Sequence, residues 1–192
     1  MNIPKVIFRR VLGEGKILTL ESITVDFGRE SGALDELDKI TPKHPASVLV
    51  IPFDLESGVW LIREFGAGTE RSVLKFPTGR IESSEDARAA ADRELAEEIG
   101  CRAKSLTYIG CLFDEPGHSN ATTCIFFAEH LRSGSAVGDE PQQPEILKFP
   151  ASNLLELIRS GRLMDSRSIA AVMQLIAHKG SPIAEDFLRV QR

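Results

Sequence analysis

One stretch near the middle of the chain, residues 79–101, combines residue types and spacings that can support chemistry. On a helix with 100° per residue, a stripe of small apolar residues continues into two carboxylates, Glu94 and Glu98. Glu97 lies on the flank of the same surface. Carboxylates at the edge of a buried stripe repel each other, so a positive group should compensate them. Because no cysteine or histidine ligand set lies nearby, their oxygens favour a hard ion, Mg²⁺ or Mn²⁺.

The alternative for this stretch is a solvated acidic helix face, steadied by an Arg93–Glu97 pair at i,i+4. The wider spacing argues against it. Gly79 is followed after five residues by Glu85, and after seven more by the run RELAEEIGC at 93–101. This complete pattern resembles the box of the Nudix hydrolase family, and the resemblance covers about residues 45–180.

The resemblance implies a Nudix α/β/α sandwich with a mixed sheet, in which a loop–helix–loop carries the metal. By matched position the metal ligands are Glu94, Glu97 and Glu98, with the carbonyl of Thr78 as a weaker candidate. Arg93 is expected to orient a glutamate and Glu85 to brace the motif. Gly79 would let the loop fold back close to the metal.

Hydrolysis of a pyrophosphate then needs a base to take a proton from water. The catalytic set expected from the resemblance is Arg93, Glu97, Glu98 and Glu140. Glu140, in the loop GDEPQQPE at 138–145, is the first candidate for the base, and Glu97 is the alternative. Arg63 and Arg80 flank the expected site, and either could hold a phosphate through two hydrogen bonds.

Several strings narrow the expected substrate to ADP-linked compounds. LIREFGAGTE (61–70), GDEP (138–141) and DSRSIAAVMQLIAHKG (165–180) resemble NudE-type ADP-compound hydrolases, and Pro116 resembles a proline of ADP-ribose-cleaving members. The implied reaction releases AMP from ADP-ribose, NADH or diadenosine polyphosphates. Another nucleotide-sugar pyrophosphatase and a non-catalytic module that senses ADP-ribose are the alternatives.

The elements that must position these residues alternate between strands and helices. β-branched and aromatic runs predict strands at 5–12, 16–27, 47–53, 58–64, 73–76, 106–113, 122–128 and 146–149. Residues 33–40 are compatible with a strand or a short helix. Helices are predicted at 84–99, starting from a Ser83–Asp86 capping box and ending at Gly100, and at about 152–160 and 166–179. This order predicts an α/β (α+β) fold, a mixed sheet with helices on its faces.

Composition narrows the class of protein further. With 192 residues, 42% of them hydrophobic, the chain can form a core without a metal or disulfide. A net charge of −5 argues against nucleic acid as a partner, and no long apolar run predicts a membrane span. The three cysteines form no CxxC pair, which favours reduced thiols in a cytoplasmic protein.

The first part of the chain is expected to form a separate β lobe. We expect residues 1–44 to make this lobe and residues 45–192 to make the Nudix domain. An isolated hairpin at 5–27 would be marginally stable and would leave apolar residues in need of a partner surface. The sequence therefore predicts a homodimer built on the lobe, acting on a small nucleotide substrate.

Overall fold

The computed structural model describes residues 3–134 and 143–178, which divide into two compact units. One unit runs from the N-terminus to Ala46 and also takes in Phe113–Thr122. The other comprises Ser47–Leu112 and the chain from Thr123 onward. The segment Phe113–Thr122, which connects two strands of the second unit, is therefore an addition to the lobe that the sequence did not predict.

The first unit contains an antiparallel sheet in the order β1-β2-β3. Its strands are β1 (Lys5–Glu14), β2 (Leu18–Asp26) and β3 (Leu34–Pro42), so the ambiguous segment at 33–40 is a strand. A hydrogen bond from the Ile40 N–H to the His118 carbonyl, 2.7 Å, ties the Phe113–Thr122 segment to β3. Every residue of β1 is exposed, including Phe8 at 60%.

The second unit is built on a larger sheet in the order β10-β5-β4-β9-β8, with β6 paired to β5 and β7 paired to β4. Its strands are β4 (Ala46–Asp54), β5 (Gly58–Gly66), β6 (Arg71–Lys75), β7 (Thr78–Arg80), β8 (Cys101–Phe113), β9 (Thr122–Ser133) and β10 (Glu145–Phe149). The predicted strands are present. β7, which the sequence analysis treated as loop, is an additional short strand.

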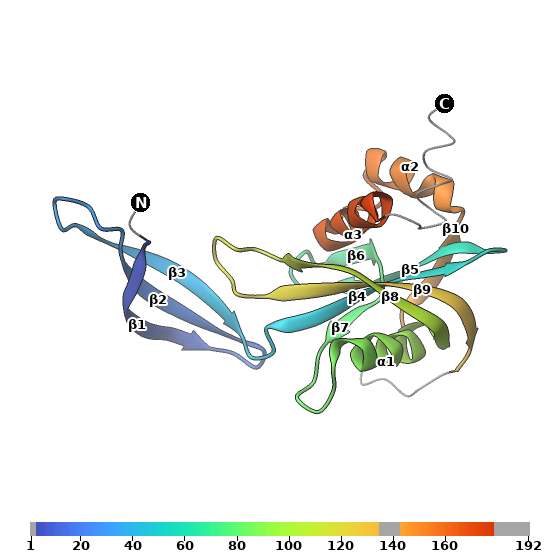
Figure 1. Cartoon of the computed structure of the whole chain (residues 1–192), viewed down its shortest axis with the longest axis horizontal. Coiled ribbons are helices and arrows are strands. Elements are labelled where there is room, and N and C mark those ends of the chain that lie inside the picture. The colour runs from blue at the N-terminus through green and yellow to red at the C-terminus, as the bar shows by residue number, and fades with distance from the viewer. Residues whose placement is uncertain (1–2, 135–142, 179–192) are drawn as a thin grey trace. The chain divides into compact units, whose positions relative to one another are not determined.

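Helices cover both faces of this sheet (Figure 1). They are α1 (Ala87–Ile99) on one face, and α2 (Leu154–Arg159) and α3 (Ser166–Ala177) on the other, with a short 3-10 turn at Ala151–Asn153. This arrangement confirms the predicted mixed α/β fold with a small antiparallel β lobe. Among the described residues, no helix is long and apolar enough to cross a membrane.

The central strand β4 shows why the sheet is covered on both faces. Successive side chains of a strand point to opposite faces. Leu49 and Ile51 pack in the cluster that contains α2 and α3 residues, whereas Val48 and Val50 pack with α1. All four are fully buried. The nearly continuous apolar run of β4 thus packs into two cores, one on each face of the sheet, and one of them holds α1 against the sheet.

Candidate active site

Helix α1 presents the acidic residues, and its ends are fixed by local hydrogen bonds. The side chain of Asp86 caps the N-terminus by accepting the Ala89 N–H at 2.8 Å, and Gly100 ends the helix with φ of 66°. The end at Gly100 was predicted correctly. The start was not, because Asp86, rather than Ser83, is the cap, and the helix begins three residues later than expected. A side-chain oxygen that accepts a hydrogen bond from the backbone N–H three residues later is the usual N-terminal cap of a helix.

Two of the helix glutamates are buried against the strand β7. Glu94 and Glu98 are only 8% and 6% exposed, and they share their face with the fully buried Ala90, Ala91 and Leu95. Glu98 accepts the backbone N–H of Thr78 at 3.0 Å. Gly79 packs so closely on Glu94 that a Cβ at this position would overlap the Glu94 carboxyl group. The Gly79 backbone therefore lies directly against the acidic helix, and the predicted approach of this loop to a metal stays a prediction.

Arg93 is the centre of the hydrogen-bond network around these glutamates. Its Nε and Nη2 donate to the two carboxyl oxygens of Glu85, at 3.2 and 2.7 Å. Its Nη1 donates to Glu94 Oε1 at 2.6 Å and to Glu97 Oε2 at 3.0 Å. A further bond from Nη2 reaches the carbonyl of Arg80 at 2.9 Å. The guanidinium thus joins the loop before α1 to the helix, while the expected orienting role of Arg93 and bracing role of Glu85 stay predictions.

The surroundings of the carboxyl groups shift their pKa values in opposite directions. Loss of hydration raises the pKa of Glu98 to about 8, and it also raises the pKa of Glu94. Hydrogen bonds from Arg93 lower the pKa of Glu85, which is already fully paired with it. The negative charge of Glu94 and Glu98 is therefore incompletely compensated by the chain, and these positions favour a proton or another cation.

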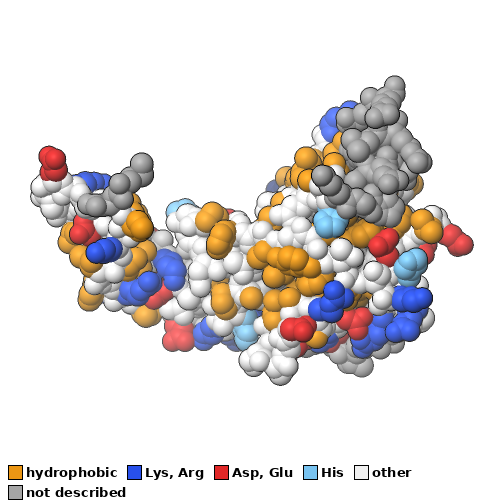
Figure 2. Space-filling model, viewed as in Figure 1, with side chains coloured by type: hydrophobic (Ala, Val, Ile, Leu, Met, Phe, Trp, Pro, Cys, Tyr) orange, Lys and Arg blue, Asp and Glu red, His pale blue; other side chains and the backbone are white. Residues whose placement is uncertain are grey.

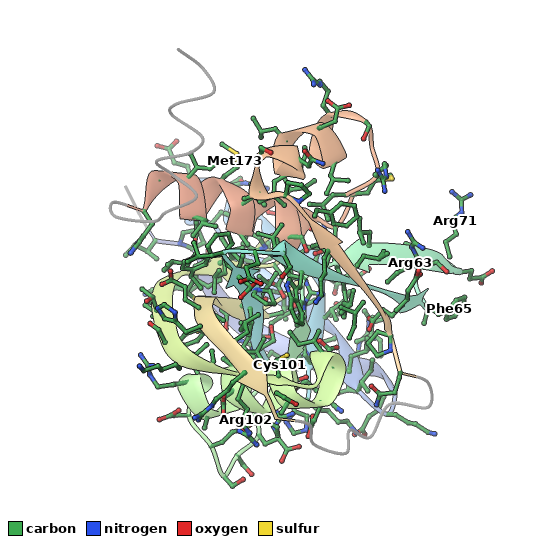
Figure 3. All side chains as sticks on the ribbon, turned by 90° about the vertical axis from the view of Figure 1, so that its right-hand side faces the viewer. Arg63, Phe65, Arg71, Cys101, Arg102 and Met173 are labelled. Atoms are coloured by element: carbon green, nitrogen blue, oxygen red, sulfur yellow. The ribbon has the colours of Figure 1, made fainter. Side chains whose placement is uncertain are left out.

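A cavity of about 220 Å³ opens beside these residues, and we call it the glutamate cavity. It brings together most of the residues expected from the sequence. Its lining comprises Ser47, Thr78, Gly79, Arg80, Glu82, Arg93, Glu94, Glu97, Glu98, Gln143, Pro144 and Arg167. Arg63 is not in this lining. It lies on β5, pairs with Glu145 at 2.7 Å, and points outward with Phe65 and Arg71 (Figure 3). Glu140 lies outside the described residues.

The carboxylates of the glutamate cavity have the chemistry of a hard-cation site, but their oxygens are engaged elsewhere. Within 3–134 and 143–178, no three acidic, histidine or cysteine side chains are arranged to hold a metal ion. Arg93 holds one carboxyl oxygen each of Glu94 and Glu97. The donor set suits a divalent ion such as Mg²⁺.

Two basic residues near the glutamates were not singled out from the sequence. Lys75, at the end of β6, is 9% exposed, bonds to Glu64 at 2.6 Å, and opposes the upward shift of the Glu98 pKa. Arg167, in the first turn of α3, also lines the glutamate cavity, although it is distant from the acidic helix in the sequence. The sequence signal that could have pointed to Lys75 was its position at the end of an apolar strand. Arg167 is brought in by packing of α3, which spacing alone does not reveal.

Comparisons with known proteins agree with this site. The NUDIX domain family matches residues 43–159, a range that includes the complete loop–helix–loop, and the chain therefore belongs to the Nudix family. The ADP compounds hydrolase NudE of Escherichia coli (strain K12) is 27% identical, over 88% of this chain and 89% of that protein. An ADP-ribose pyrophosphatase of Bacillus subtilis (strain 168) is also 27% identical, over 89% of this chain and 91% of the relative.

The fold is likewise shared with a solved structure described as an ADP compounds hydrolase. The TM-score is 0.84 at 25% identity, and the match covers 100% of this chain and 97% of that one. A GDP-mannose pyrophosphatase of Cronobacter sakazakii (strain ATCC BAA-894) is 24% identical, over 86% of this chain and 91% of the relative. Family, relatives and fold together identify the chain as a Nudix pyrophosphohydrolase.

Proposed function

We propose that this chain hydrolyses the pyrophosphate bond of ADP-linked compounds and releases AMP, with Mg²⁺ or Mn²⁺ as cofactor. The observation that carries the proposal is the glutamate cavity, where two buried carboxylates with raised pKa values face an opening lined by Arg80 and Arg167. The names of two relatives, an ADP compounds hydrolase and an ADP-ribose pyrophosphatase, supply the substrate class. ADP-ribose, NADH and diadenosine polyphosphates are the candidate substrates.

The metal would be held by Glu94, Glu97 and Glu98, with the carbonyl of Thr78 as a further ligand. Their oxygens are hard donors, and burial of Glu94 and Glu98 makes their uncompensated charge favourable to a divalent cation. A bound ion would neutralise phosphate charge and lower the pKa of water in the cavity. Arg93 would keep Glu85 as its partner and orient the helix carboxylates. Glu140 and Glu97 are the two candidates for the base, and of these only Glu97 lies within the described residues.

The arginines proposed to bind substrate differ in their surroundings. Arg80 follows Gly79 directly and lines the glutamate cavity, so a phosphate held there is within its range. Arg63 pairs with Glu145 and is 40% exposed, so a role in binding requires it to exchange that partner for substrate. We retain both as candidates and expect Arg80→Ala to raise KM more than Arg63→Ala, because only Arg80 lines the cavity.

A second candidate function is hydrolysis of another nucleotide sugar. The GDP-mannose pyrophosphatase relative is similar over most of both chains, although at 24% identity. A module that binds ADP-ribose without cleaving it is less consistent with the site, since all three helix glutamates are present beside the cavity. These functions differ in products, so one assay separates them.

The test is a panel of ADP-ribose, NADH, diadenosine polyphosphates and GDP-mannose, each with Mg²⁺ and with Mn²⁺. We expect AMP as a product of the adenine compounds, and slower turnover of GDP-mannose. Glu98→Gln serves as the matched control, because it preserves shape and removes the charge. Preferential release of GMP would favour the second candidate, and saturable binding of ADP-ribose with no turnover would favour the sensor.

We further propose a homodimer in which the β lobe of residues 1–44 supplies the interface. Hydrophobic side chains lie at the surface of its sheet (Figure 2). Those exposed by more than a third include Val6, Ile7, Phe8, Val11, Leu12, Ile17, Leu18, Leu20, Phe27, Leu34 and Leu37. A surface this apolar in a soluble lobe is typical of an interaction site.

Removing residues 1–44 should give a monomer, an aggregate or an enzyme with a much raised KM. Light scattering of the intact protein at micromolar concentration provides the direct measurement, and a mass of one chain, 21.1 kDa, would contradict the dimer. We also expect a cytoplasmic location with free thiols, which cell fractionation and thiol titration of the native protein would test.

A further inference from the structure

A second cavity lies beside the β5–β6 hairpin and shares a residue with the glutamate cavity. This hairpin cavity has a volume of about 570 Å³. It is lined by residues of the hairpin and by the segment 162–167, which leads into the first turn of α3. Arg167 lines both cavities. A molecule that occupies both would therefore pass Arg167, which makes this side chain the natural contact for the middle of such a molecule.

The guanidinium of Arg167 has weak contacts within the described part of the chain. Its one recorded ion pair joins Nε to Asp165 Oδ1 at 4.0 Å, which is beyond hydrogen-bond range. Asp165 is itself engaged, since its Oδ2 accepts both the N–H and the hydroxyl of Ser168. By contrast, Arg93 is saturated by three glutamates. Arg167 can therefore bind an anion without giving up a hydrogen-bonded carboxylate, whereas Arg93 cannot.

Buried hydrogen bonds fix the backbone that carries Arg167. The hydroxyl of Ser168, which is fully buried, accepts the Phe76 N–H at 3.0 Å and donates to Asp165 at 2.7 Å. Phe76 stands two residues before Thr78, whose N–H binds Glu98. The first turn of α3 is thus connected through Ser168 to the segment that holds the glutamates. The backbone at Arg167 is therefore already in place before substrate arrives, and only the side chain has to be ordered on binding.

We propose that Arg167 binds a phosphate oxygen of the substrate and that the organic group attached to that phosphate enters the hairpin cavity. The inference rests on the proposed function and specifies how its site receives substrate. An arginine can donate two parallel hydrogen bonds to a phosphate. The hairpin cavity offers both apolar and cationic lining, in Val73, Leu74, Met164, Arg71 and Arg162.

This arrangement selects for a pyrophosphate that carries a bulky group on each side. A cavity of about 570 Å³ lies within the usual range for small-molecule sites and accommodates a nucleoside or a ribose. The glutamate cavity, at about 220 Å³, is too small to hold the whole of a disubstituted pyrophosphate. A nucleoside triphosphate would leave one of the two positions without an organic group, so it should be the poorer substrate.

The first experiment compares Arg167→Ala and Arg167→Lys with Arg159→Ala. Arg159 is the matched control, because it is 81% exposed, lies on α2 and lines neither cavity. We measure kcat and KM for ADP-ribose, together with inhibition constants for ADP and for adenosine. Loss of a charged hydrogen bond to phosphate should raise KM and the ADP inhibition constant roughly tenfold to hundredfold.

Adenosine has no phosphate, so its inhibition constant should remain unchanged in every variant. Arg167→Lys should recover part of the ADP affinity, because it keeps the charge but not the two-bond geometry. Unaltered melting temperatures would exclude a merely structural effect. If wild-type enzyme hydrolyses ADP-ribose while both Arg167 variants retain its KM and its ADP affinity, the inference is overturned and the proposed function stands. If wild type hydrolyses no ADP-linked compound, the proposed function itself fails.

The second experiment fills the hairpin cavity with Met164→Trp, a change at a position that is 76% exposed and outside the hydrophobic core. The two halves of ADP-ribose are tested separately as inhibitors, with AMP representing one and ribose 5-phosphate the other. We expect the inhibition constant of one half to rise at least fivefold while that of the other stays constant. The affected half is the one that occupies the hairpin cavity. Unchanged constants for both halves would show that substrate does not enter it.

Discussion

Gly79 offers a direct test of whether the position of Glu94 matters for activity. A Cβ at residue 79 would overlap the carboxyl carbon and both oxygens of Glu94, a side chain that is 8% exposed. Real Cβ contacts closer than 3.0 Å are essentially never seen, so in Gly79→Ala the carboxylate must withdraw by at least about 1 Å. Its hydrogen bond with Arg93, 2.6 Å long, would be strained or broken.

The expected effect is larger on catalysis than on folding. A misplacement of about 1 Å in a catalytic assembly can cost on the order of 10²-fold in rate, which is our estimate for kcat of Gly79→Ala. Overfilling a packed site typically destabilises by about 1–3 kcal/mol. The assay is AMP release from ADP-ribose with saturating Mg²⁺, accompanied by thermal unfolding. Gly117→Ala is the control, since a Cβ there has no heavy atom within 4 Å and the backbone requires no positive φ.

A double variant separates crowding from other effects of the new methyl group. If the clash with Glu94 is the cause, Gly79→Ala should cost much less stability in a Glu94→Ala background, because the overlapping carboxyl group is absent. Near-wild-type kcat for Gly79→Ala with an unchanged melting temperature would refute the reasoning. It would show that the Glu94 carboxylate is not required where the structure places it.

Three further outcomes test the metal and the protonation of the site. Glu94→Gln and Glu98→Gln should each reduce kcat by at least ~10²-fold in a steady-state assay, and near-normal turnover of both would contradict their role as metal ligands. EDTA should abolish activity but leave the far-UV circular dichroism unchanged, because the core packs without a metal; global unfolding would indicate a structural site instead. In metal-free protein, burial raises the pKa of Glu98 to about 8, so the folded chain keeps a proton that the unfolded chain releases from about pH 4.5 upward. Stability should therefore decline as pH rises from 5 to 8, by up to ~1.4 kcal/mol per pH unit, and Glu98→Gln should flatten the decline seen in melting temperatures.

Local patterns in the sequence were sufficient to place the acidic helix. The C-terminal glycine, the alanine stripe and its continuation into Glu94 and Glu98 all depend on neighbours within a few turns, and the structure confirms them. The start of α1 was misplaced because Ser83 and Asp86 are both good caps, and only the path of the loop decides between them. That path is set by Arg93, which binds Glu85 eight residues earlier in the chain.

Residues that approach the site from distant segments were not predictable in the same way. Ser168 contacts Phe76 across 92 positions in the sequence, and this contact brings Arg167 to the cavity. Likewise Lys75 is paired with Glu64 by the register of β5 and β6. No periodicity reports such pairings, because they depend on which distant strands pair and on which helix packs on which face of the sheet. The grouping of Phe113–Thr122 with the β lobe has the same origin.

The balance of charge in the glutamate cavity explains why its residues together favour a bound cation. One guanidinium, that of Arg93, is divided among Glu85, Glu94 and Glu97, and its shortest bonds to two of them are 2.7 and 2.6 Å. Glu98 receives a backbone N–H and the more distant influence of Lys75. Burial disfavours uncompensated negative charge, and without a metal ion it therefore raises the pKa values of Glu94 and Glu98. A divalent cation would satisfy it more completely, and a pyrophosphate bound to that cation would meet Arg80 and Arg167 across the same opening.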